Sequence, residues 1–144
     1  DRLAVLGARL LCQTLDGFSA GTIRRIPQAH SQATYAPLLK KTDGLIDWNK
    51  PAALIESFIR GMSPWPGAFT FWGSRRLKIF RAAAASASDG APPGTVQKAS
   101  AHELTVATGK GALAILEIQG ASGSRLPIAA FLRGCRIAPG DRLA

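Results

Sequence analysis

Residues 61–72 read GMSPWPGAFTFW, and the periodicity of the chain changes across them. In residues 51–60, just before this stretch, apolar side chains recur at helical spacing, which predicts a helix. Pro64 and Pro66 each fix φ at about −65° and restrict the residue before them, so the helix cannot continue. Beyond the prolines, apolar and polar residues alternate with a period of two, which is typical of β-strands.

Short strand-like segments separated by turn sequences follow this corner. They span residues 67–73, 75–83, 94–100, 102–108 and 112–119. The last segment is apolar on both faces, as expected for a strand inside a closed sheet. Short strands at this spacing predict a mainly β fold with helices, built around a small barrel and followed by a short helix over 127–134. The sequence SASDGAPPG at 86–94 predicts the turn between the second and third strands.

The chain before the barrel predicts two helices and a connection. Leucines at helical spacing predict a helix over residues 1–16 that ends near Gly17. Residues 18–42 show no sustained period and contain two prolines, which predicts an extended linker. The next helix is expected from Pro51 to Arg60, with Asn49 as its N-cap.

The aromatic residues of the corner could form a binding surface or a structural plug. Trp65 lies between two prolines, and Phe69, Phe71 and Trp72 follow it. Because this turn has little conformational freedom, we expect Trp65 to be a plug under the barrel. Phe69 and Phe71 are two residues apart and should share one face of the first strand.

Composition limits the classes of partner. Eighteen Lys and Arg residues against nine Asp and Glu leave a net charge of +9, which favours a polyanion, with nucleic acid ahead of an acidic membrane surface. No apolar run approaches the ~20 residues of a membrane-spanning helix. Cys12 and Cys135 lack CxxC spacing, so we expect reduced, mostly buried thiols in a cytoplasmic protein. Without an initiator Met or a signal-like segment, the chain is expected to be a fragment or a processed piece.

Candidates for catalysis are few. His30 and His102 lack any HxxxH, HExxH or GxSxG context and are expected to be surface or turn residues. Asp43 and Asp47 could share a helix face, but a carboxylate pair outside any visible pocket is a weak signal, and we expect Asp47 to form a hydrogen bond with backbone near the start of the following helix. The sequence TGKGA at 108–112 joins two strands, so it predicts a hairpin turn and not a phosphate-binding P-loop. A metal site is not indicated.

The strand RRLKIFR at 75–81 carries the most informative charges. If Leu77 and Ile79 face the interior, then Arg76, Lys78 and Phe80 share the outer face. Cations and an aromatic ring on one strand suit a surface that follows a nucleic-acid backbone. The alternative is an ordinary solvated face whose Phe80 is covered by a loop or helix. Further cations lie in the linker, turns and tail: Arg24, Arg25, Lys40, Lys41, Lys98, Lys110, Arg125, Arg133, Arg136 and Arg142.

The order of motifs from residue 33 onward resembles the C-terminal part of the methionyl-tRNA formyltransferase family. The motifs are TYAPLLKKTDGLIDWNKPAALIESFIRGMSPWPGAFTFW, RLKIFRA, PGTV, VATGKGALAILEIQ, AAFLRG and PGDRL. The resemblance implies that residues 1–17 are the last helix of a truncated Rossmann-like domain. It implies that 18–42 are a linker and that 43–144 form an OB-like Greek-key barrel.

In this family the missing N-terminal domain transfers a formyl group from 10-formyltetrahydrofolate to the amino group of initiator methionyl-tRNA. The resemblance implies that the fragment holds tRNA, binds no cofactor itself and is inactive alone. It also implies a cytoplasmic, monomeric parent enzyme, in which the partners of this fragment are the tRNA and the catalytic domain. Lys41 falls on a lysine position before IDW, Lys78 on a basic strand position, and Arg125 in a loop that is lysine-rich in relatives. The expected tRNA-binding residues are Lys40, Lys41, Arg76, Lys78, Arg81 and Arg125. The expected structural residues are Asp47, Trp48, Pro64, Trp65, Pro66 and Gly67.

Two alternatives share part of this pattern. Formyltransferases that act on amino-sugar nucleotides resemble the chain in IDW and PWPGAF but need no extended cationic face. The barrel could also be a purely structural module that orients the catalytic domain.

Overall fold

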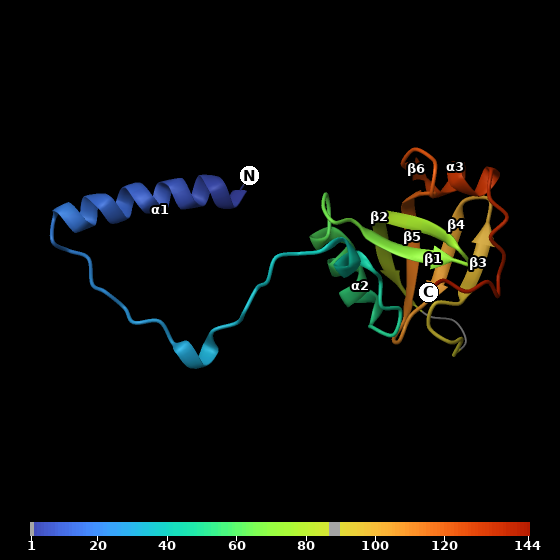
Figure 1. Ribbon diagram of the computed structural model, residues 1–144, viewed down its shortest axis with the longest axis horizontal. Helices are drawn as coiled ribbons and strands as arrows, with labels where there is room; N and C mark the ends of the chain where they lie inside the picture. The colour runs from blue at the N-terminus through green and yellow to red at the C-terminus, as the bar shows by residue number, and fades with distance from the viewer. Residues whose placement is uncertain (1, 87–89) are drawn as a thin grey trace. The chain divides into compact units, whose positions relative to one another are not determined.

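The computed structural model describes residues 2–86 and 90–144 (Figure 1). Asp1 and residues 87–89, part of the turn predicted over 86–94, lie outside the described residues. The chain divides into two compact units, Asp1–Pro37 and Leu38–Ala144. The second unit therefore begins at Leu38, earlier than the barrel boundary expected at residue 43.

The first unit contains the amphipathic helix α1, Arg2–Ser19, and one turn of 3-10 helix, η1, His30–Gln32. The helix continues past its expected end near Gly17. None of its described residues is buried, and its apolar side chains include Leu3 at 83% and Phe18 at 66% exposure. Cys12 is also exposed, so the expectation that both cysteines are mostly buried is wrong for this residue.

The second unit is built around one antiparallel sheet. Its strands are β1 Ala68–Trp72, β2 Arg75–Ala85, β3 Val96–Ser100, β4 Glu103–Ala107, β5 Ala112–Gln119 and β6 Leu126–Pro127. The strand order is β1-β2-β5-β4-β3, with β6 paired to β5. The predicted strands are all present. The sequence did not indicate β6, because two residues are too few to show alternation.

Residues 141–144 lie between the two outer strands and close the sheet into a barrel. Phe71 N donates to Ala144 O at 2.7 Å, and Ala144 N donates to Phe71 O at 2.9 Å. On the other side, Leu143 N donates to Gly94 O and Val96 N donates to Asp141 O, both at 2.8 Å. Closure satisfies the outer backbone groups of β1 and β3 that would otherwise form open edges. The predicted mainly β fold with a small barrel is confirmed.

Apolar side chains fill the barrel from the strands and from two short helices. α2, Ala52–Gly61, packs against β2, and α3, Ile128–Arg133, packs against β5. The most buried side chains include Leu104, Leu113 and Ile118, each 0% exposed. Burial of one such side chain stabilises the fold by about 1.5–3 kcal/mol, so this shared core accounts for much of the unit's cohesion.

The corner after α2 differs from expectation in its tryptophan. Trp65 is 54% exposed, so the prediction that it plugs the barrel is wrong. Trp48 occupies the core instead and is 4% exposed. The peptide bonds before Pro64 and Pro66 are both cis, and Gly67 has φ +80°. Gly67 N donates to Met62 O at 2.8 Å, which closes the corner between α2 and β1.

A buried hydrogen-bond chain joins three separate segments of the barrel. Trp48 Nε1 donates to Thr70 Oγ1 at 3.0 Å, and Thr70 Oγ1 donates to Ala144 O at 3.0 Å. Thr70 is 0% exposed, so without the hydroxyl the Trp48 indole N–H would lose its hydrogen bond inside the protein, and Ala144 O would be left with its bond from Phe71 N. The segment before α2, the strand β1 and the closing segment are therefore held in one register.

The entry to α2 is organised by Asp47. Asp47 Oδ1 accepts hydrogen bonds from Asn49 N and Asn49 Nδ2, both at 3.0 Å. These hydrogen bonds lower the pKa of the Asp47 carboxyl group, and the charge of Lys50 adds to the effect. Pro51 occupies the N-cap position without a side-chain cap, so the expectation that Asn49 caps the helix is wrong. The predicted bond from Asp47 to backbone near the helix is confirmed.

Candidate nucleic-acid interface

Strand β2 separates apolar and cationic residues onto opposite faces. Leu77 and Ile79 are each 2% exposed and point into the barrel, whereas Arg76 and Lys78 are half-buried on its outside. The register with β5 shifts on both sides of Arg81. A β-bulge adds a residue to one strand of a pair and so interrupts the alternation of faces. As a result Phe80 and Arg81 both lie outside the core.

The outer residues of β2 have partners on both neighbouring strands. In the β1–β2 register, Phe71 pairs with Arg76 and Phe69 with Lys78. The two phenylalanines therefore share one face of β1, as predicted, and this is the face that carries Arg76 and Lys78 on β2. On the other side, Arg81 pairs with Glu117 of β5. We refer to this cluster as the basic face: Phe69, Phe71, Arg76, Lys78, Phe80, Arg81, Glu117 and Arg125.

Arg76 makes a cation–π contact with one ring of an aromatic pair. Its guanidinium carbon is 3.7 Å from the centroid of the Phe69 ring, and Phe71 packs edge-on to Phe69 at 5.7 Å. A cation–π contact of this kind is worth about 0.5–2 kcal/mol and restrains the guanidinium. Arg76 Nε is buried without a hydrogen-bond partner among the residues that the structure describes. Arg76 therefore has a fixed position and no carboxylate partner there.

Arg81 and Arg125 share a single carboxylate. Arg125 Nε donates to Glu117 Oε2 at 2.8 Å, and Arg125 Nη2 contacts the same oxygen. Arg81 Nη1 lies 3.8 Å from Glu117 Oε1. The hydrogen bond from Arg125 lowers the pKa of the Glu117 carboxyl group; partial desolvation opposes this, and the charges of Arg125 and Arg81 reinforce it. Glu117 is thus held in its ionised form between two cations.

Arg125 also covers the exposed aromatic of β2. Its guanidinium carbon lies 4.7 Å from the centroid of the Phe80 ring. A loop residue therefore covers Phe80, as the alternative interpretation of this strand expected, and the covering residue is itself a cation. Sequence reasoning missed Glu117. The available signal was one carboxylate in the otherwise uncharged segment ALAILEIQ, next to a strand that carries Arg76 and Arg81.

Lys40 and Lys41 lie at the edge of the β1 side of the barrel. Lys41 begins a short 3-10 helix, η2, Lys41–Gly44, and Leu45 then forms a parallel bridge with Phe69. Ile46 N donates to Phe69 O at 2.8 Å, which fixes this segment along β1. Both lysine side chains are exposed, and neither forms an ion pair within residues 2–86 and 90–144.

Candidate catalytic residues do not converge. Asp43 Oδ2 accepts from Lys40 N at 2.7 Å and Asp47 from Asn49, so each carboxylate serves its own local turn. His30 and His102 are exposed, as expected. In the described part of the chain, no group of three or more His, Cys, Asp and Glu residues could hold a metal ion. The predicted hairpin at 108–111 is confirmed by the bond from Thr108 Oγ1 to Lys110 O at 2.9 Å.

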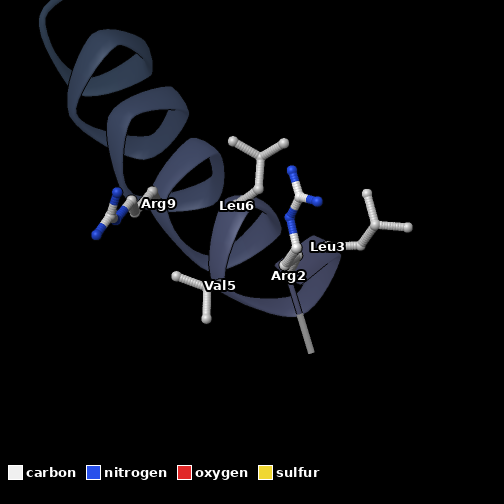
Figure 2. Close-up of a pocket in the computed structure, with 5 residues that line it drawn as sticks. All are labelled: Arg2, Leu3, Val5, Leu6 and Arg9. Carbon is white, nitrogen blue, oxygen red and sulfur yellow. The ribbon is translucent and has the colours of Figure 1, made fainter.

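Neither the surface hollow on α1 nor the second cysteine has the features of a reactive site. A surface hollow on α1 is lined by Arg2, Leu3, Val5, Leu6 and Arg9, which all project from the first turns of this one helix (Figure 2). Cys135 is half-buried, and desolvation raises the pKa of its thiol, which disfavours the nucleophilic thiolate. No described helix has the length and apolar character needed to cross a membrane.

Comparison with known proteins finds related sequences over nearly the whole chain. A family model described as "Formyl transferase, C-terminal domain" matches residues 38–136. The methionyl-tRNA formyltransferase of Desulfotalea psychrophila is 46% identical over 137 residues, covering 95% of this chain and 42% of the relative. That of Pelobacter propionicus is 49% identical over 144 residues, covering 99% of this chain and 44% of the relative. The chain spans less than half the length of these relatives.

Solved structures agree on the fold. HypX from Aquifex aeolicus in complex with tetrahydrofolic acid has a TM-score of 0.56 and 20% identity, covering 85% of this chain and 22% of that chain. A HypX variant with an A392F and an I419F substitution covers 90% of this chain with a TM-score of 0.55. The family model includes every strand of the barrel and every residue of the basic face. The chain therefore belongs to the formyl transferase C-terminal domain family.

Proposed function

We propose that this chain is the tRNA-binding C-terminal region of a methionyl-tRNA formyltransferase. The complete enzyme would transfer a formyl group from 10-formyltetrahydrofolate to the amino group of initiator methionyl-tRNA in the cytoplasm. Support comes from the family and from relatives of that name at 46% and 49% identity. In this proposal the folate and the chemistry belong to a catalytic domain that precedes the chain, and this region supplies charge and orientation.

The observation that carries the proposal is the set of cations left without carboxylate partners near one side of the barrel. Within the described residues, Arg76 and Lys78 of β2 form no ion pair, and the same holds for Lys40 and Lys41. A phosphate backbone needs charge more than base-specific geometry, and these four residues offer it along neighbouring elements. Arg81 and Arg125 complete the proposed surface, although Glu117 already neutralises part of their charge.

Helix α1 fits the other half of the proposal. Its exposed leucines and Phe18 form the kind of apolar stripe that normally packs against a neighbouring domain. We assign α1 to the end of the catalytic domain and residues 20–37 to the connection between that domain and the barrel. Monomeric assembly of the enzyme belongs to the same proposal.

Salt dependence of tRNA binding tests the proposal. If the four unpaired cations each neutralise a phosphate, log K should fall by about 3–4 per tenfold rise in salt. Fluorescence anisotropy of a labelled initiator tRNA transcript, titrated with the 144-residue chain at several KCl concentrations, measures this slope. Lys98 lies on β3 and pairs with Glu103 at 3.9 Å, so it is not one of these four cations. Lys98→Gln is therefore a control, and its salt slope should equal that of the native chain.

The contrary outcomes separate the alternatives. Binding that does not change with salt, or no binding at low salt, would exclude a phosphate-based contact. Absence of binding by a correctly folded chain would instead favour a structural module that orients the catalytic domain. Equal affinity for tRNA and for an amino-sugar nucleotide would favour the small-substrate formyltransferases.

A further inference from the structure

Glu117 has a position in the basic face that the tRNA-binding proposal does not use. Arg81 comes from β2 and Arg125 from the loop between β5 and β6, yet both guanidinium groups reach the same carboxylate. The Arg81 and Arg125 side chains are 64% and 54% exposed, whereas the Glu117 side chain is 23% exposed. The carboxylate is therefore more shielded from solvent than the two cations that it joins.

One edge of the Arg125 guanidinium is committed to this carboxylate. Its Nε and Nη2 both contact Glu117 Oε2, and its guanidinium carbon lies over the Phe80 ring. A guanidinium presents paired N–H groups along two edges, Nε–Nη and Nη1–Nη2, and Glu117 occupies the first of them. Arg125 can therefore give this edge to Glu117 or to a phosphate, but not to both.

Charge gives the direction of the effect. The three side chains carry a net charge of +1, whereas Arg81 and Arg125 alone would carry +2. Phosphate contacts depend mainly on charge and tolerate loose geometry. Removal of the Glu117 negative charge therefore strengthens the phosphate contacts of Arg81 and Arg125. This gain exceeds the loss that comes from less ordered arginine side chains. At contact distance in water a unit charge changes an equilibrium constant by about fivefold.

We propose that Glu117 is a built-in competitor of RNA phosphate for Arg81 and for the Nε–Nη2 edge of Arg125. This inference rests on the proposed tRNA function and adds to it an element that sets affinity. A polyanion that meets only this corner of the basic face gains full use of Arg125 only by breaking an existing ion pair. Glu117 thereby weakens the binding of a polyanion that reaches only Arg81 and Arg125. It weakens less the binding of an RNA that also reaches Arg76, Lys78 and the lysines at 40 and 41.

The first test compares two substitutions that remove the same charge. Glu117→Gln should tighten binding of labelled initiator tRNA by about 3–10-fold at ~0.1 M salt. It should also steepen the salt slope by about 1–2, because one or two arginines become available. Glu103→Gln is the control: Glu103 also pairs with a cation, Lys98 at 3.9 Å, but lies on β4 with β5 between it and β2. It should change affinity by less than about twofold.

The second test asks whether the effect passes through Arg125. Arg125→Ala should weaken binding less than about twofold in the native background and about fivefold in the Glu117→Gln background. Thermal unfolding of each variant confirms that the barrel is intact. Glu117→Gln binding that equals that of Glu103→Gln, or is weaker than native, would overturn the inference. Equal costs of Arg125→Ala in both backgrounds would also overturn it.

A failure of the proposed tRNA binding can be distinguished from a failure of the competitor role of Glu117. If the native chain does not bind tRNA at low salt, the tRNA proposal falls. The competitor role is then judged on elution from heparin, an anionic probe. Later elution of Glu117→Gln than of Glu103→Gln, abolished by Arg125→Ala, supports competition, and identical elution of the two glutamine variants refutes it.

Discussion

Replacement of Lys41, Arg76 and Lys78 by glutamate should weaken binding of initiator tRNA by about 100-fold or more at moderate salt. Each change removes a proposed phosphate contact and adds a repulsive charge. The three residues come from η2 and β2, which lie on either side of β1. Anisotropy titration at one fixed salt concentration measures the loss, and the unfolding midpoint shows whether loss of the Arg76–Phe69 stack matters for the fold.

A matched variant separates location from total charge. Lys50, Lys98 and Lys110 replaced by glutamate change the net charge by the same amount away from the basic face. This control should bind at least about tenfold more tightly than the first variant. Equal loss in the two variants would mean that only net charge matters and that the basic face is not the contact. In a complete enzyme that contains this region, the first variant should raise KM for methionyl-tRNA with little change in kcat.

The second large effect concerns stability and one glycine. A Cβ atom at Gly109 would lie 1.8 Å from Asn49 O and 2.6 Å from Asn49 C, which are backbone atoms. Gly109 N also donates to Trp48 O at 2.9 Å and to Lys50 O at 3.1 Å. Gly109→Ala must therefore push the β4–β5 turn away from the segment that leads into α2. We expect the free energy of unfolding to fall by about 3 kcal/mol or more.

Gly123→Ala is the control for this change, because nothing lies within 4 Å of a Cβ atom built at Gly123. It should alter the free energy of unfolding by less than about 0.5 kcal/mol. Chemical denaturation followed by tryptophan fluorescence measures both variants. An unchanged midpoint for Gly109→Ala would show that the turn and the Asn49 backbone do not approach each other as described.

The strands were predictable because each half-buried segment carries its own signal. In β2, Leu77 and Ile79 alternate with Arg76 and Lys78, and that alternation alone assigns the strand and its faces. The closing segment, residues 141–144, carries no such signal. Its role depends on Phe71 and Gly94, which are far away in the sequence and adjacent only in the folded barrel. Local periodicity in the sequence cannot predict contacts between segments that are so far apart along the chain.

Residue type and local sequence do not show which of two tryptophans is buried. Trp48 and Trp65 are the same residue type near the same helix, and burial was expected for Trp65. Trp48 is buried instead, because Thr70 Oγ1 accepts its indole N–H at 3.0 Å inside the core. The choice between them depends on a partner 22 positions away, Thr70 in β1. Glu117 escaped notice for a similar reason, since its significance comes from Arg81 and Arg125 on other elements.

Lysine acetylation with and without bound tRNA tests the central claim most directly, because it asks where the RNA lies. The 144-residue chain is treated briefly with an N-hydroxysuccinimide ester of acetic acid, and modification at each lysine is read by mass spectrometry. The account predicts that tRNA protects Lys41 and Lys78 and leaves Lys98 as reactive as in the free chain, because β5 and β4 separate β3 from β2 in the strand order. Unchanged reactivity at Lys78 in the tRNA complex, or equal protection at Lys98, would contradict binding along the basic face.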